Sequence, residues 1–124
     1  MKRIVIAFVA GALCTLALVA PRPVAQAQSQ SEMNQMEAKN YAKADAELNR
    51  VYAKLTKKLD KEGIAKLKRA QRAWIAYRDT EMELAADMAR GGSMMPMLSS
   101  GAGAQLTKDR TKYLNQYLEQ FEER

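Results

Sequence analysis

From Gln28 to Asp60 the chain contains neither proline nor glycine, the two residues that most often end a helix. Apolar side chains in this stretch recur at steps of three and four residues, which places them on one face of a helix. They are Tyr41, Ala44, Leu48, Val51, Tyr52, Leu55 and Leu59. The pattern predicts a long amphipathic helix that must bury this face against other helices.

Two further stretches have the same spacing. Gly63 is expected to end the first helix, because glycine adopts the left-handed conformation found at helix ends. A second helix is predicted from about 64 to 90, where Gly91-Gly92 ends it, and a third from about 104 to 122. Residues 93–103 are expected to be irregular, since they include a proline, two glycines and three serines.

These patterns predict an all-α fold. No window alternates strictly between apolar and polar residues, so no sheet is expected. The short link at Gly63 indicates that the first two helices form an antiparallel pair, with the third helix along their shared groove. We therefore expect three long amphipathic helices in an antiparallel up-down bundle.

The first residues have the features of a cleavable signal peptide. Two basic residues precede the uncharged apolar run Ile4–Ala20, and Ala25-Gln26-Ala27 matches the small-x-small pattern of a cleavage site. We predict a leader at 1–27, a helical domain at 28–124, and a periplasmic or secreted location. The alternative is an uncleaved anchor, for which the run is shorter than the ~20 residues that a membrane span needs.

Export would leave a chain without cysteine. Cys14 is the single cysteine and lies in the apolar run, where Leu13 before it does not fit a lipoprotein signal. The mature domain would therefore have no disulfide and would depend on packing alone. The leader contains three basic residues and no acidic one, so 17 basic and 14 acidic residues would leave a net charge of +3.

Most catalytic and metal-binding arrangements are excluded by composition. The chain has no histidine, so Ser–His and Cys–His nucleophiles and ordinary zinc sites are not possible in the mature domain. We expect no enzyme activity, no cofactor and no metal. One alternative is a Cu(I) site of thioethers, although methionine more often fills core space. The methionines concerned are Met82, Met88, Met94, Met95 and Met97.

Polar side chains interrupt the apolar face on all three predicted helices. Buried charges are costly unless they are paired, so we expect carboxylates of this set to pair with its arginines across the helices. In particular, Asp45 or Glu81 should pair with Arg78 or Arg110. The alternative interpretation of the same set is a ligand-binding polar pocket. The predicted network comprises Asp45, Asn49, Tyr52, Gln71, Trp74, Arg78, Glu81 and Arg110.

Positive charge concentrates around the predicted bend at Gly63. Between Arg50 and Arg78 ten basic residues face two acidic ones, a net charge of +8. A basic tip of this kind could contact an anionic polymer, a lipid or an acidic partner, or be a simple exposed helix end. Nucleic acid is disfavoured, because no aromatic stacking surface lies among these charges. The tip comprises Lys54, Lys57, Lys58, Lys61, Lys66, Lys68, Arg69 and Arg72.

Five ordered motifs between Ser31 and Leu118 resemble the LprI-type lysozyme inhibitor family. They are Glu32-Met33-Asn34-Gln35, Ala44-Asp45-Ala46-Glu47-Leu48-Asn49 with Tyr52, Ala70-Gln71-Arg72-Ala73-Trp74-Ile75 with Tyr77-Arg78-Asp79, Gly91-Gly92-Ser93 with Pro96-Met97, and Leu106-Thr107 with Arg110. The resemblance implies an all-helical exported domain that inhibits lysozyme. Family members usually carry disulfide cysteines, whereas this chain has Met36, Met82 and the cysteine-free stretch 99–104 in their places.

The functional prediction is an exported, non-catalytic binding protein of this family, with lysozyme or another envelope protein as its partner. Animal lysozymes are strongly basic, so contact is expected through the acidic run Asp79, Glu81, Glu83 and Asp87 or through a loop. The loop contact would use Gly91, Gly92, Ser93, Pro96 and Met97, unless these glycines only serve a turn between helices. The alternative function is an envelope protein whose basic tip contacts anionic polymer, lipid or an acidic partner.

Overall fold

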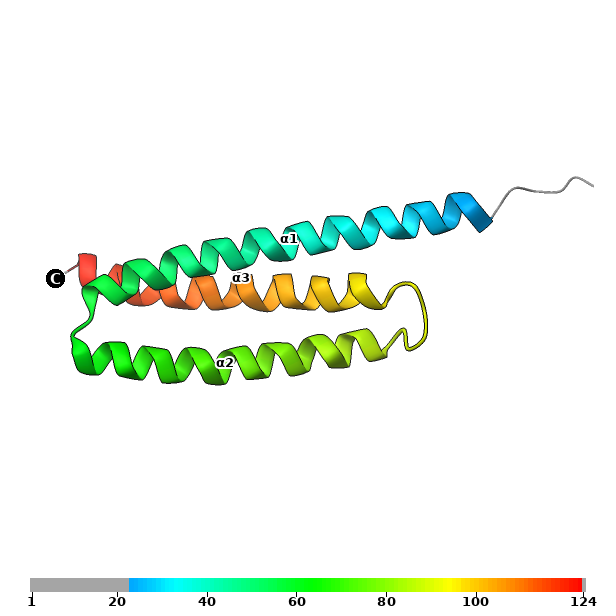
Figure 1. Cartoon of the computed structure of the whole chain (residues 1–124). Helices are drawn as coiled ribbons and strands as arrows, with labels where there is room; N and C mark the ends of the chain where they lie inside the picture. The colour runs from blue at the N-terminus through cyan, green and yellow to red at the C-terminus, as the bar shows by residue number, and fades with distance from the viewer. Residues whose placement is uncertain (1–22, 124) are drawn as a thin grey trace, which may run out of the picture.

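The computed structural model describes residues 23–123, which form three α-helices and no strand. α1 spans Pro23–Lys58, α2 spans Lys61–Asp87 and α3 spans Met95–Glu122. Each helix reverses the direction of the one before it (Figure 1). The all-helical class is therefore confirmed for this part of the chain. Most of the predicted leader, with Cys14, lies outside the described residues.

The turn between α1 and α2 lies at Leu59 and Asp60, so the predicted break at Gly63 is wrong. Asp60 is the N-cap of α2, and its Oδ1 accepts a hydrogen bond from the backbone N–H of Gly63 at 2.7 Å. Aspartate is favoured there because its side chain satisfies a free backbone donor of the first turn. Gly63 therefore lies inside the helix, where an added Cβ would come within 3.2 Å of the Leu59 and Asp60 side chains.

The stretch that was expected to be irregular is largely helical. α3 begins at Met95 rather than near residue 104, with Pro96 in its first turn. Proline suits that position, because its φ is already helical and its missing N–H would have no partner there. Farther along α3, a Cβ at Gly103 would lie 2.7 Å from Sδ of Met82 and 3.1 Å from Cε2 of Tyr41. This glycine serves a close approach of the helices rather than a break.

α3 lies between the other two helices and packs against both, whereas α1 and α2 hardly approach each other (Figure 1). Their antiparallel direction agrees with the prediction, but the prediction that they form the packed pair is wrong. α3 takes this place because its buried face is lined by small residues, which let neighbouring backbones come close. These are Gly103, Ala104, Thr107 and Thr111.

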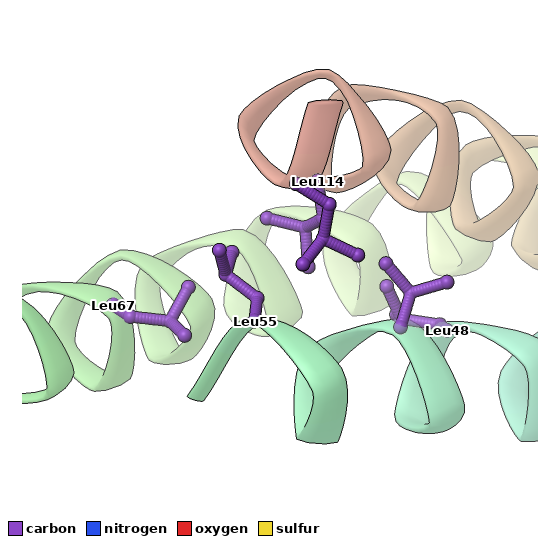
Figure 2. Close-up of a cluster of buried hydrophobic side chains, with 6 residues drawn as sticks. Leu48, Leu55, Leu67 and Leu114 are labelled. Atoms are coloured by element: carbon purple, nitrogen blue, oxygen red, sulfur yellow. The ribbon is translucent and has the colours of Figure 1, made fainter. Parts of the chain in front are cut away.

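An aliphatic core lies at the place where the three helices meet. Figure 2 shows Leu48 and Leu55 of α1, Leu67 of α2 and Leu114 of α3 gathered there. Burial of one such side chain contributes about 1.5–3 kcal/mol. The buried cluster comprises Leu48, Val51, Leu55, Leu67, Leu114 and Leu118.

Several large apolar side chains of α2 and α3 are exposed. α2 approaches α3 with the row that contains Leu67, Trp74 and Arg78, so positions a quarter turn away lie beside the contact. The exposed residues are Tyr77, Leu84, Met88, Tyr113 and Tyr117.

None of the helices in residues 23–123 has an apolar stretch long enough to cross a membrane.

Candidate functional site

Arginine and aromatic side chains alternate across all three helices. The guanidinium carbon of Arg78 on α2 lies 5.5 Å from the ring centroid of Tyr41 on α1 and 5.2 Å from that of Trp74. Arg110 on α3 lies 5.8 Å from the same Trp74 ring and 5.6 Å from the Tyr113 ring. We call this series the arginine–aromatic ladder. Each such cation–π contact contributes about 0.5–2 kcal/mol, and most where water is excluded.

Arg78 is largely buried, with 12% of its side chain exposed. Its Nε and Nη2 donate to Oδ1 of Asp79 at 2.9 and 2.8 Å, and its Nη1 donates to Oδ1 of Asp45 at 3.4 Å. Asp45 belongs to α1, so this contact crosses between helices whose backbones hardly meet. Burial raises the pKa of the neighbouring Tyr41 hydroxyl, and the positive charge of Arg78 partly opposes that shift.

Arg110 has a different environment. Its Nε donates to Oε1 of Gln71 on α2 at 3.1 Å, and no carboxylate of residues 23–123 lies within ion-pair distance of it. Burial lowers the pKa of Arg110, because a charged group loses hydration without gaining a counter-ion. The ladder thus contains one neutralised arginine and one that keeps an uncompensated positive charge.

The structure brings together part of the predicted polar network. Asn49 reaches Oδ2 of Asp45 at 3.3 Å, whereas Tyr52 packs against the aliphatic core. Of the expected pairings, that of Asp45 with Arg78 is present at 3.4 Å, whereas Glu81 has no ion pair among residues 23–123 and Asp79 is the second partner of Arg78. Tyr41 and Tyr113 were not predicted as members of the network. The spacing of Tyr113 three residues after Arg110 was the available signal, since such positions lie together on a helix.

The predicted partner-contact loop lies at the end of the bundle where α2 leads into α3, which we call the loop end (Figure 1). Gly91 has a φ of +75°, a backbone conformation that is strained for any residue with a side chain. This glycine is therefore needed for the turn itself. The loop is also tied to α1, because Nδ2 of Asn34 donates to the carbonyl oxygen of Ser93 at 3.0 Å. Nε2 of Gln30 approaches Sδ of Met97 at 3.9 Å. Gly92 and Pro96 remain exposed.

Apolar side chains are exposed beside this loop. Met88 is 86% exposed directly after α2, and Leu84 is 62% exposed one turn earlier. Glu83 and Asp87, each one residue before Leu84 and Met88, form a neighbouring row on the helix and are also exposed. Asp87 forms an ion pair with Arg90 at 2.6 Å. An apolar row beside an acidic row is therefore presented to solvent. Leu84 and Met88 follow the three- and four-residue spacing of a buried helical face, so periodicity alone does not reveal this surface.

The basic tip lies at the opposite end, where α1 turns into α2, and all eight of its side chains are exposed. Lys66 pairs with Glu62 at 2.7 Å. Lys54, Lys57 and Lys58 of α1 line one groove together with Glu119 and Glu122 of α3, so the α1 side of the tip has mixed charge. Glu119 and Glu122 offset part of the positive charge on this side, because α3 ends at the same place (Figure 1).

The methionines that were considered for Cu(I) have different surroundings. Sδ of Met82 lies against Gly103, and Met97 approaches Gln30 of α1. Met88 is largely exposed. Met82 therefore fills space between α2 and α3, and it meets the stretch 99–104 where the resemblance also places a family cysteine.

Comparison with known proteins identifies the family. The family model described as "Lysozyme inhibitor LprI" matches residues 22–114. A protein of Rhizobium meliloti (strain 1021), described as uncharacterized, is 44% identical over 110 residues, which cover 78% of this chain and 79% of the relative. No solved structure matches the chain. The matched region includes α1, α2, the greater part of α3 and every member of the arginine–aromatic ladder, and the chain belongs to the LprI lysozyme inhibitor family.

Proposed function

We propose that the protein is an exported, non-catalytic inhibitor that binds lysozyme through the loop end of its bundle. Family membership supports lysozyme as the partner. The observation that carries the choice of surface is the exposure of Met88, at 86%, and of Leu84, at 62%, beside the acidic Glu83 and Asp87. Exposed apolar side chains favour a protein contact, and neighbouring carboxylates attract a basic partner.

The distribution of charge supports this surface more strongly than the net charge does. The exposed lysines and arginines of the tip lie at the far end of the bundle, and the run Asp79–Asp87 lies toward the loop end. Asp79 and Asp87 of this run are paired with arginines, so the attraction depends mainly on Glu81 and Glu83. A basic lysozyme would therefore be repelled from one end and attracted to the other, which orients the encounter. A net positive chain can bind a positive partner in this way.

The hydrogen bond from Asn34 to Ser93 also supports contact at the loop end. It holds the α2–α3 connection against α1, so the loop is already ordered before a partner arrives. A preformed contact surface loses less conformational entropy on binding. Asn34→Ala should leave the helical content unchanged and weaken inhibition by loosening the loop.

The test is an assay of lysozyme activity against bacterial cell walls, with increasing amounts of the purified protein. We expect inhibition that is reduced at least tenfold by the double substitution Leu84→Ser and Met88→Ser. Tyr77→Ser is the matched control, because Tyr77 is 52% exposed on the same helix but lies away from the loop. Absence of inhibition at a large molar excess would contradict the proposal.

Charge reversal tests the steering separately. Glu83→Lys should slow the association with lysozyme and make it less sensitive to salt, because salt screens exposed charges over about 10 Å at 0.1 M. Lys68→Glu at the other end of the molecule should have little effect or a small opposite one. The measurement is the association rate at two salt concentrations.

The proposed export has its own test. Cleavage after Ala27 would remove the first turn of α1. Ala27, Gln28 and Ser29 are exposed, so the cut would fall where these side chains are not packed against the bundle. Mass spectrometry of the envelope fraction should find a mature chain that begins at Gln28.

The alternative function, a contact of the basic tip with an anionic partner, has less support, because Glu119 and Glu122 lie beside the lysines of α1.

A further inference from the structure

A groove of about 430 Å³ opens between the three helices at the basic-tip end, away from the proposed lysozyme contact. Its volume is within the range of about 300–1,000 Å³ that small-molecule sites occupy. All three helices contribute, so the groove depends on the assembled bundle. The lining residues are Leu55, Leu59, Gly63, Lys66, Leu67, Ala70, Arg110, Tyr113, Leu114 and Tyr117.

The inner wall of the groove is aliphatic. Leu55, Leu67 and Leu114 belong to the buried core, and each is less than a tenth exposed. Ala70 stands at the lip and is exposed, which leaves the entrance free of a large side chain. The core leucines form the floor of the groove, and a ligand that enters here would gain apolar contact mainly with the partly exposed Leu59, Tyr113 and Tyr117 that also line it.

The rim carries an uncompensated positive charge. Arg110 uses Nε for Gln71, and its two Nη groups have no hydrogen bond or carboxylate partner among residues 23–123. Tyr113 and Tyr117 stand beside it, with their hydroxyl oxygens 3.2 Å apart. The other cation, Lys66, is exposed and paired with Glu62. Arg110 is thus the group to which an anionic ligand would bind most strongly.

We propose that this groove binds a single-chain anionic amphiphile, such as a long-chain fatty acid. The acyl chain would lie over the core leucines and against Leu59, Tyr113 and Tyr117, and the carboxylate would accept hydrogen bonds from the free Nη groups of Arg110. The ladder prepares the site, because Trp74 and Tyr113 hold the guanidinium at the rim before a ligand binds. The proposal requires a ligand whose head group is negatively charged. A purely apolar pocket would not distinguish such a ligand from an uncharged one.

Trp74 gives a direct measurement. It is the single tryptophan of the chain, and its ring lies 5.8 Å from the guanidinium carbon of Arg110. The protein, expressed from the full sequence and purified, is titrated with a brominated long-chain fatty acid, whose bromine quenches nearby tryptophan. Competition with dodecanoate, dodecanol and dodecylammonium, below their micelle concentrations, then ranks the head groups. We expect saturable quenching at one equivalent, with dodecanoate the best competitor.

Two substitutions locate the ligand. Arg110→Gln should weaken dodecanoate binding roughly ten- to a hundredfold, the factor that corresponds to a hydrogen bond with a charged group. Ala70→Phe should weaken it by filling the entrance while it leaves every charge in place. Lys68→Gln is the matched control, since Lys68 is an exposed cation of α2 outside the groove. Circular dichroism checks that each variant keeps its helices.

Three results would overturn the proposal. Equal competition by dodecanol or dodecylammonium would show that no anion is recognised. Unchanged binding in both Arg110→Gln and Ala70→Phe would place the ligand elsewhere. Binding only to phosphatidylglycerol vesicles, lost in Lys68→Gln, would indicate a membrane-surface contact of the basic tip. Lysozyme inhibition is measured in parallel with Arg110→Gln and should be unchanged, so failure of the groove leaves the proposed inhibition intact.

Discussion

The two sides of α3 hold their partner helices by different means. Toward α1, the contact is made by small and aliphatic residues that are almost fully buried, such as Leu48, Val51 and Ala104. Toward α2, it depends on long polar and aromatic side chains, above all Trp74 and Arg110. In α2, all of which the structure describes, Leu67 is the one buried residue.

This difference implies different local stabilities within one bundle. Aliphatic burial between α1 and α3 contributes to the global free energy of unfolding, whereas α2 is held mainly by contacts that are partly open to water. Elements with few buried apolar contacts open at a lower free energy than the whole molecule. We expect α2 to detach in a partial opening while α1 and α3 remain paired.

The largest expected effect comes from the α1–α3 interface. Leu48→Ala should lower the free energy of unfolding by about 2–5 kcal/mol, because it leaves a cavity at a side chain that is 1% exposed. The measurement is urea unfolding followed by circular dichroism. Leu84→Ala is the control, since Leu84 is 62% exposed. Equal losses in the two variants would contradict the packing described for this interface.

Gly103 tests the place where the three helices approach. Gly103→Val should destabilise the protein by about 1–3 kcal/mol, because its Cβ would lie 2.7 Å from Sδ of Met82 and must displace that side chain. Gly101→Ala is the matched change on the same helix. A Cβ there meets only Oε2 of Glu37, at 3.7 Å, so the better helix propensity of alanine should stabilise α3 by up to about 1 kcal/mol. Thermal unfolding of both variants should give shifts of opposite sign.

Arg78 tests the other interface. Arg78→Met keeps much of the side chain's length but removes the hydrogen bonds to Asp45 and Asp79, for an expected loss of about 1–3 kcal/mol. The substitution should lower mainly the local stability of α2. Hydrogen exchange should speed up for amides of residues 65–85 while the centre of α1 stays protected. Uniform acceleration in all three helices would show that α2 does not open separately.

The same division explains what could be predicted from the sequence. Helix number and class follow from local periodicity, and the interior of each helix was placed correctly for that reason. The turn at Asp60 differs from the prediction because a capping aspartate begins α2 before the glycine is reached. The helical start at Pro96 was missed because breakers were counted without their position in the first turn.

Long-range arrangement was the harder part of the prediction. The central position of α3 depends on the close approach at Gly103, which local spacing does not reveal. The mixed charge beside Lys54 depends on Glu119, which joins it only through the fold. Contact between Arg78 and Asp45 was among the expected pairings, but Asp79 replaced the expected Glu81. Partner choice among several nearby charges requires three-dimensional positions.

A buried hydroxyl at the α1–α3 interface gives a small expected gain in stability. Oγ1 of Thr107 has no hydrogen-bond partner among residues 23–123 and the residue is 0% exposed, whereas the hydroxyl of Thr111 donates to the Thr107 carbonyl oxygen at 2.8 Å. Thr107→Val should therefore stabilise the protein by about 1 kcal/mol, since it replaces an unsatisfied polar group with a methyl of similar size. Thr111→Val, which removes a satisfied hydroxyl, should give no such gain. If the two variants shift the urea midpoint equally, the Thr107 hydroxyl has a partner in solution, and the α1–α3 interface is less dry than its burial indicates.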